Sequence, residues 1–162
     1  MQTVAFMPQP LPHRDTLADE LKRRVTSATL LRCNGPIARR TTLRVGGPAE
    51  IYVEPASEAD LAEVVKVCAA RDTSLFVLGR GSNLLVRDGG IRGVVLSLAQ
   101  PAFSAIEIVG ERLQCGAGAK LKQVAVAAKR AGLSGMEFLE GIPGSVGGAL
   151  RMNAGAMAGA TF

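Results

Sequence analysis

The chain has 162 residues, of which 48% are hydrophobic and 20% are charged, and its formal net charge is +5. This length and apolar content predict one domain with a real core and argue against a disordered chain. No apolar run approaches the length of a membrane span. Residues 1–7 lack a basic leader and prolines follow them, so we expect a cytoplasmic protein with no membrane partner.

The positive charge is unevenly distributed along the chain. Residues 1–44 hold eight Lys/Arg and three Asp/Glu, whereas residues 45–162 hold eleven of each. Aromatic residues make up only 4% of the chain and are not interleaved with the basic ones. Since nucleic-acid binding favours a basic face with stacking aromatics, we expect no nucleic-acid partner. The composition does not exclude a binding pocket for an anionic small molecule.

The cysteines and the histidine exclude several kinds of site. Cys33, Cys68 and Cys115 are odd in number and form no C-x-x-C pair, which favours free thiols over disulfides or zinc. His13 is the single histidine and lies in the proline-rich start. His-based catalytic triads and most metal sites are therefore not expected.

Residues that typically start a helix or break a regular element divide the chain into two predicted parts. Residues 1–14 are expected to be a flexible lead, and Thr16-x-x-Asp19 with apolar residues at helical spacing predicts a short helix over 17–25. Asn34-Gly35-Pro36 is expected to break the chain. We therefore predict an N-terminal extension over 1–33 and one domain over 34–162.

A β–α–β unit is predicted over residues 49–78. Residues 49–53 alternate as in a strand, and residues 75–78 form an apolar run typical of a strand buried on both faces. Between them, Ser57-x-x-Asp60 predicts a helix start, followed by an apolar stripe. That stripe is expected to comprise Leu61, Val64, Val65 and Cys68.

Further elements follow with glycine-rich links between them. Short strands are expected over 84–86 and 94–98, and residues 105–115 alternate as in a hairpin. A second amphipathic helix is predicted over 121–128, ended by Gly132. The last residues resemble an element interrupted at Phe162, so we expect the domain to be incomplete at its C-terminus.

Three glycine loops stand out as candidates for a ligand site. The first, Gly79–Asn83, follows a predicted strand, but it does not match G-x-G-x-x-G and no helix follows it, so a Rossmann or P-loop site is not indicated. The second is Gly116–Gly118. The third, Gly141–Gly155, could be a tight turn or an anion site at a short helix that begins near Val146, with Ser145 as its cap and outward N–H groups.

Backbone N–H groups of such loops can bind a pyrophosphate without lysine. Ser82, Asn83, Ser145 and Asn153 add neutral hydrogen-bond donors. A neutral cradle rich in donors suits a bulky dinucleotide better than a basic point-charge site would.

Three ordered motifs carry a resemblance to a known family. Thr41–Pro48 reads TTLRVGGP, Leu78–Leu85 reads LGRGSNLL, and Gly135–Ala149 reads GMEFLEGIPGSVGGA, followed by Met152–Gly155, MNAG. In this order the motifs resemble UDP-N-acetylenolpyruvoylglucosamine reductase (UDP-N-acetylmuramate dehydrogenase), over about residues 34–159.

The resemblance implies an α+β, two-lobed FAD-binding domain of the vanillyl-alcohol-oxidase type, with non-covalent FAD as the cofactor. Family enzymes take hydride from NADPH and reduce the enolpyruvyl double bond of a UDP-sugar in peptidoglycan precursor synthesis. By motif position the FAD pyrophosphate is expected at Gly79, Arg80, Gly81, Ser82 and Asn83, and the rest of the cofactor at Gly116, Gly118, Ile142, Pro143, Gly144, Ser145, Gly147, Gly148, Asn153 and Gly155.

The same resemblance limits what the chain is expected to do. The family's catalytic Arg, Ser and Glu, and its substrate-binding domain, align beyond Phe162, so no catalytic residue is assigned to this chain. Residues 158–162 also depart from the family pattern. Two alternatives stay open: another FAD-linked oxidoreductase of the same fold, and a flavin-binding module without activity.

Overall fold

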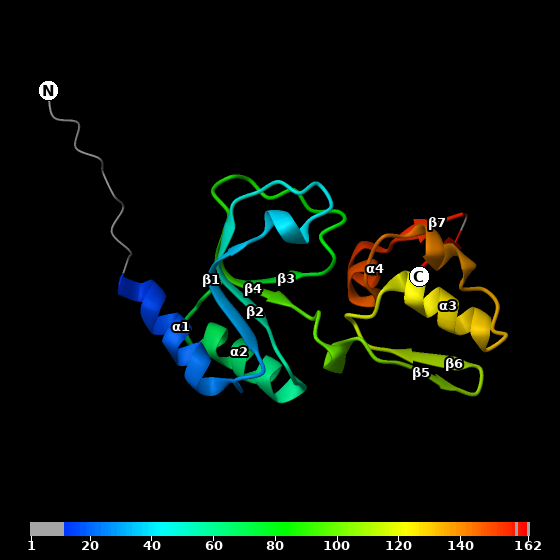
Figure 1. The fold of residues 1–162 in the computed structure, drawn as a ribbon, viewed down its shortest axis with the longest axis horizontal. Coiled ribbons are helices and arrows are strands. Elements are labelled where there is room, and N and C mark those ends of the chain that lie inside the picture. The colour runs from blue at the N-terminus through cyan, green and yellow to red at the C-terminus, as the bar shows by residue number, and fades with distance from the viewer. Residues whose placement is uncertain (1–11, 158, 162) are drawn as a thin grey trace, which may run out of the picture.

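The computed structural model describes residues 12–157 and 159–161, with the side chains of residues 12–16 left out. Its ribbon forms two lobes (Figure 1). The elements of the first lobe are α1 (Pro12–Arg24), β1 (Leu30–Pro36), η1 (Ala38–Arg40), β2 (Pro48–Glu54), α2 (Glu58–Ala70), β3 (Leu75–Leu78) and β4 (Ile91–Ser97). Those of the second lobe are η2 (Pro101–Phe103), β5 (Ile106–Val109), β6 (Arg112–Cys115), α3 (Leu121–Arg130), η3 (Glu137–Gly141), α4 (Val146–Met152), β7 (Gly155–Ala156) and β8 (Gly159–Ala160).

A four-stranded sheet organises the first lobe, with the strand order β1-β2-β4-β3. β1 is antiparallel to β2, whereas β4 is parallel to both of its neighbours. The predicted β–α–β unit is confirmed as β2–α2–β3, and β4 lies between its two strands. β3 and β4 are parallel, so their carboxyl ends lie at the same end of the sheet. The Gly79–Asn83 loop follows β3 directly and therefore begins at that end.

The two faces of this sheet are covered differently. On one face α1 and α2 pack on Ile51, Val53, Val94 and Leu96, which are almost fully buried. On the other face the loops before β2 and after β3 cover Tyr52 and Val95, with Ile37 and Val86 as their apolar contacts. In Figure 1 these loops lie on the far side of the sheet from α2. Helices thus supply the larger core, and loops close the face that leads to the candidate site.

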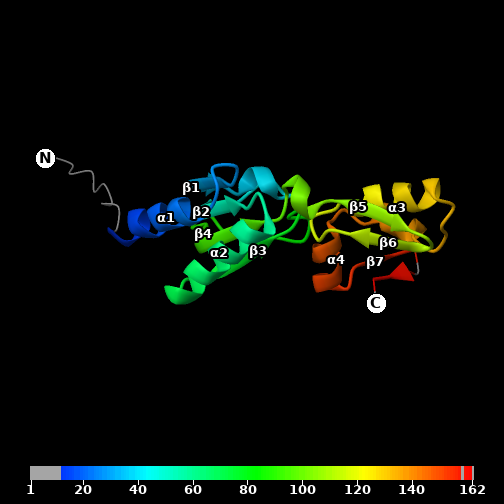
Figure 2. The same ribbon diagram turned by 90° about the horizontal axis from the view of Figure 1, so that it is seen from below.

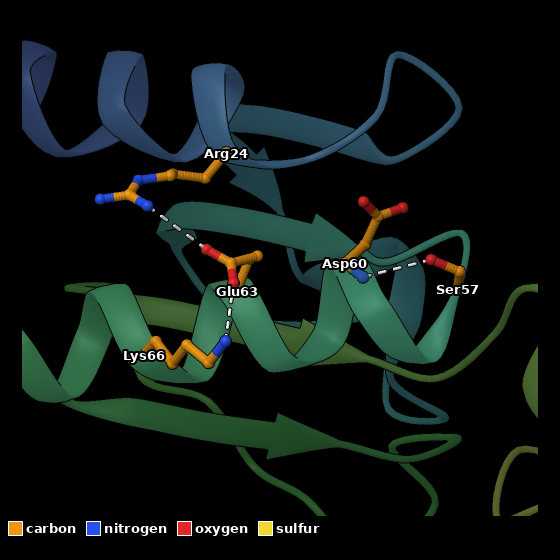
Figure 3. A network of polar contacts seen from close by, with 5 residues as sticks. All are labelled: Arg24, Ser57, Asp60, Glu63 and Lys66. Atoms are coloured by element: carbon orange, nitrogen blue, oxygen red, sulfur yellow. Dashed lines mark hydrogen bonds and ion pairs between the residues drawn. The ribbon is translucent and has the colours of Figure 1, made fainter.

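A buried carboxylate joins α2 to the turn after α1. Asp60 is 3% exposed, and its carboxylate accepts hydrogen bonds from Thr26 N (2.8 Å), Thr26 Oγ1 (2.7 Å) and Thr29 Oγ1 (2.9 Å). Its own N–H donates to the Ser57 cap at 3.1 Å (Figure 3). Burial tends to raise the pKa of Asp60, but these hydrogen bonds outweigh it and leave the pKa below its usual value.

The predicted cap of α2 is confirmed, since Ser57 accepts from Asp60 N, and Cys68 is buried as predicted. Figure 3 also shows Glu63 between Lys66 on its own helix and Arg24 on α1. These exposed ion pairs add little to stability.

The second lobe packs α3, η3 and α4 around a smaller core. Its buried residues are Ala119, Leu121, Val124, Leu139 and Ala149. The predicted hairpin is confirmed as β5–β6, and the predicted second helix as α3, with Gly132 in the left-handed region (φ +70°) just past its end. Ser145 caps α4, which begins at Val146 as predicted.

Two predictions near the N-terminus are corrected. The helix begins at Pro12 instead of residue 17, consistent with proline's fixed φ at the first helical position; residues 1–11 of the predicted flexible lead lie outside the described residues. The break predicted at 34–36 is wrong, because β1 runs through it with Asn34 at φ +52°. Gly35 allows this path, since an added Cβ would lie 2.8 Å from Tyr52 Cβ. Where the FAD-binding domain begins stays a prediction.

Three other details also differ from the sequence-based predictions. β3 is an edge strand whose Phe76 and Val77 are exposed, so it is not buried on both faces. Val65 is exposed, and Val67, three residues after the buried Val64, lies in the core instead, so the apolar stripe extends to the other side of Val64 and Cys68. Residues 84–86 are a loop instead of a strand, and Val86 packs against the sheet from this loop.

Candidate functional site

The three predicted glycine loops meet where the two lobes touch. A Cβ added to Gly79 would lie 3.3 Å from Ser145 Oγ and 3.9 Å from Gly148 Cα. A Cβ added to Gly147 would lie 3.1 Å from the Cβ of Ala117, which is the residue between Gly116 and Gly118 in the second glycine loop. Residues distant in the sequence therefore form one junction, and the loop after β3 touches the start of α4.

The N-terminus of α4 lacks the free N–H groups that an anion site at this helix would use. Its early N–H groups have protein acceptors: Val146 donates to Ala119 O (2.9 Å), Gly147 to Ala117 O (2.8 Å), and Gly148 to Ser145 Oγ (3.4 Å). The expectation of outward, unpaired N–H groups at this helix is therefore wrong. The glycines let α4 approach the 116–118 segment closely, which is a packing role.

The second glycine loop is also engaged with the protein. Gly116 N donates to Ala105 O at 2.9 Å, and Gly118 N donates to Phe103 O at 2.8 Å. An added Cβ on Gly118 would lie 1.9 Å from Leu98 O. This loop fastens the hairpin and α4 to the link that leaves β4.

The Gly79–Asn83 loop is different, because its donors are available. Within the described part of the chain, no backbone N–H of residues 79–83 donates to a protein acceptor. All of its residues except Gly81 are exposed. No ion pair among the described residues includes Arg80. Backbone donors without a protein acceptor, Ser82, Asn83 and an unpaired guanidinium thus occur together in one largely exposed loop.

A neighbouring segment holds this loop in place. Thr42 N donates to Gly81 O at 3.1 Å, and an added Cβ on Gly81 would lie 2.3 Å from Arg40 O. Further along, Gly47 N donates to Arg87 O at 3.0 Å. Sequence reasoning assigned no role to residues 40–42, although Thr41–Pro48 was one of the motifs that carried the resemblance.

The remaining predicted residues lie around this junction or away from it. Ile142 is half-buried in the second core, Pro143 is exposed, and Gly144 contacts Leu121. Asn153 and Gly155 lie past the other end of α4, about 10 Å from Ser145 along a seven-residue helix. The structure does not bring those two to the junction, and a cofactor role for each of these residues stays a prediction.

Comparison with known proteins identifies the family. Residues 49–162 match the family described as FAD binding domain. The chain belongs to the FAD-binding domain family. This confirms the predicted fold class and the prediction of FAD as the cofactor.

Relatives narrow the resemblance within this family. UDP-N-acetylenolpyruvoylglucosamine reductase from Rhodospirillum rubrum is 55% identical over 120 residues, 74% of this chain and 37% of that protein. The reductase from Azorhizobium caulinodans is 45% identical over 161 residues, 99% of this chain and 49% of that protein. The crystal structure of the reductase from Thermus caldophilus superposes with a TM-score of 0.65 at 39% identity, covering 82% of this chain and 44% of that one.

These findings confirm the predicted resemblance. The chain spans half or less of the length of these relatives. In the described residues, no helix combines the length and apolar character needed to cross a membrane.

The geometry of the junction suits the phosphates of FAD. A pyrophosphate is bound well by clustered backbone N–H groups, hydroxyls and a bidentate guanidinium. The Gly79–Asn83 loop offers all three and includes no carboxylate. Of the three glycine loops, this is the one in which no backbone N–H has a protein acceptor among the described residues.

Two of the three cysteines are in environments that disfavour covalent attachment of a cofactor. Cys115 packs in the second core next to the Gly116–Gly118 loop, and burial raises the pKa of its thiol. Cys68 is buried within α2, on the helix-covered face of the first-lobe sheet, and burial raises its pKa as well. Since the thiolate is the nucleophile, neither is prepared to attack a flavin.

Proposed function

We propose that this chain is the FAD-binding part of a UDP-N-acetylenolpyruvoylglucosamine reductase, acting in the cytoplasm in peptidoglycan precursor synthesis. The observation that carries the proposal is 45% identity to such a reductase over 161 residues. It is supported by the exposed donor loop at Gly79–Asn83. When bound, FAD would supply the redox chemistry of hydride transfer between NADPH and the enolpyruvyl double bond of the UDP-sugar.

The residues of this chain bind and orient the cofactor. The N–H groups of residues 79–83 donate to the pyrophosphate, and Arg80 balances its charge. The first N–H groups of α4 and those of Gly116 and Gly118 do not donate to it, because they are already paired within the protein. They instead form the rigid wall against which Gly79 sits. Groups that handle the substrate belong to the part of the relatives that this chain does not span.

The visible absorption spectrum of the purified chain tests FAD binding. A flavin band that is lost to the supernatant on acid precipitation supports non-covalent FAD. Flavin that stays with the precipitated polypeptide would instead favour another FAD-linked oxidoreductase with covalent attachment. A colourless chain that takes up no added FAD would contradict the proposal.

NADPH oxidation in the presence of the UDP-sugar tests whether these residues only bind FAD or also catalyse the reaction. We expect the 162 residues alone to show weak or absent turnover, since a half-site leaves the flavin open to water. Full turnover by these residues would show that they carry the whole reaction. FAD binding without any turnover, even when the missing part of the relatives is supplied, would favour an inactive flavin-binding module.

A further inference from the structure

A second polar cluster lies under the segment that holds the cofactor loop. Arg40 donates through Nη1 to Glu54 Oε1 at 2.6 Å, and its guanidinium carbon lies 3.9 Å from the centre of the Tyr52 ring. Tyr52 OH donates to the same Glu54 oxygen at 2.6 Å. The three side chains join η1 to β2.

This cluster is well shielded from solvent. Tyr52 is 1% exposed, and the side chains of Arg40 and Glu54 are 30% and 13% exposed. Burial, and then the hydrogen bond to Glu54, hold the pKa of Tyr52 well above its usual range, so the phenol stays a donor at neutral pH. A shielded, planar pairing of this kind fixes the direction of an arginine better than an exposed ion pair does.

The backbone of Arg40 connects this cluster to the cofactor loop. Its carbonyl oxygen lies directly under Gly81, and two residues later Thr42 N donates to Gly81 O. Arg40 itself is engaged by Glu54, whereas Arg80 carries the unpaired charge of the site. The two arginines therefore have different roles.

We propose that Arg40, clamped by Tyr52 and Glu54, is a positioning residue that sets the conformation of the Gly79–Asn83 loop for FAD. The proposal rests on the proposed function, since it concerns how that loop binds the cofactor. Its physical basis is preorganisation: the loop donors are fixed before binding, so less order is lost when the pyrophosphate arrives. Arg40 acts through backbone contacts and needs no contact with FAD.

The first test is FAD affinity in the full chain, measured by quenching of flavin fluorescence. Arg40→Ala is expected to raise the Kd by about tenfold or more, with Arg40→Lys in between because it keeps the charge but loses the planar stack. Ser57→Ala is the matched control, because it removes a cap on the opposite face of the sheet. It is expected to lower the urea midpoint while leaving the Kd within about twofold.

The second test does not require FAD. Amide hydrogen exchange of Thr42 reports its hydrogen bond to Gly81 O. Exchange of Gly47 reports a second hydrogen bond between the same two loops, from Gly47 N to Arg87 O. Arg40→Ala is expected to speed exchange at Thr42 by about tenfold while changing Gly47 by less than about twofold. Tyr52→Phe, which removes only the hydroxyl, is expected to shift Thr42 in the same direction and provides the test if Arg40→Ala does not fold.

Each outcome supports or overturns the positioning role. An unchanged Kd with unchanged Thr42 exchange would overturn it, and so would equal losses of affinity in Arg40→Ala and Ser57→Ala. If the unsubstituted chain binds no FAD, the proposed function fails and this role fails with it. If that chain binds FAD and the variants bind equally well, only the positioning role fails.

Discussion

Gly81→Ala is expected to disrupt the loop assigned to the FAD pyrophosphate. Gly81 has φ +63°, and an added Cβ would lie 2.3 Å from Arg40 O and 2.9 Å from Thr41 Cα. A left-handed backbone costs a non-glycine residue about 1–2 kcal/mol. Overpacking against atoms that cannot rotate away adds about 1–3 kcal/mol. If the loop stays in place, the variant loses about 2–5 kcal/mol of unfolding free energy.

The loop can also escape the clash by moving. In that case the stability loss is smaller, but the donors of residues 79–83 leave their positions and FAD affinity falls. Urea unfolding followed by far-UV circular dichroism suits this chain, which has no tryptophan and one tyrosine. FAD titration by flavin fluorescence completes the measurement.

Gly89→Ala is the matched control for this experiment. Gly89 lies in the same long loop, but an added Cβ there meets no atom within 4 Å, and its backbone is not in the left-handed region. We expect Gly89→Ala to change the unfolding free energy by no more than about 0.5 kcal/mol and to leave FAD affinity unchanged. If Gly81→Ala matches Gly89→Ala in both measurements, the packing of Gly81 on Arg40 is not as described.

Two further predictions concern the helix-covered side of the first lobe and the thiols. The pKa of Asp60 is lowered in the folded state, so its stabilisation is present at neutral pH and is lost as the pH falls below about 4 and through the folded pKa. Asp60→Asn should therefore lower the urea midpoint at pH 7 and narrow its difference between pH 7 and pH 3; an unaltered pH dependence would show that other carboxylates dominate. A thiol reagent at pH 8 should modify the exposed Cys33 rapidly, and Cys68 and Cys115 slowly, because burial shields them and raises their pKa. Three rapidly modified thiols in the folded chain would contradict the two cores as described.

Local patterns predicted elements whose signals lie within one segment. The cap at Ser57, the stripe of α3 and the hairpin of residues 105–115 each depend on residues a few positions apart. Their structures follow those signals closely. The prediction at Asn34–Pro36 failed because the turn tendency of this segment was opposed by a distant partner. Pairing with β2 and close packing of Gly35 on Tyr52 outweigh it.

Burial of β3 could not be predicted from its own residues. The apolar run Leu75–Leu78 is typical of a central parallel strand, yet β4 enters between β2 and β3 and leaves β3 at the edge. The order of strands in a sheet depends on where the chain places the strand that follows, and a single apolar run does not encode that position. The hydrogen-bond partners of the α4 N-terminus were hidden for the same reason, since Ala117 and Ala119 come from another loop.

The glycines of this site therefore have two different roles, close backbone packing and exposure of N–H donors, and only the structure distinguishes them. Gly47, Gly118 and Gly147 lie where another backbone passes so closely that a side chain would clash. Their N–H groups, like those of most of the third motif, are paired within the protein. The Gly79–Asn83 loop combines such packing at Gly81 with donors that have no protein acceptor in the described residues. A pyrophosphate needs those donors more than it needs glycines, so we propose this loop for the cofactor's phosphates and infer that the other two glycine motifs contribute by bringing the lobes together.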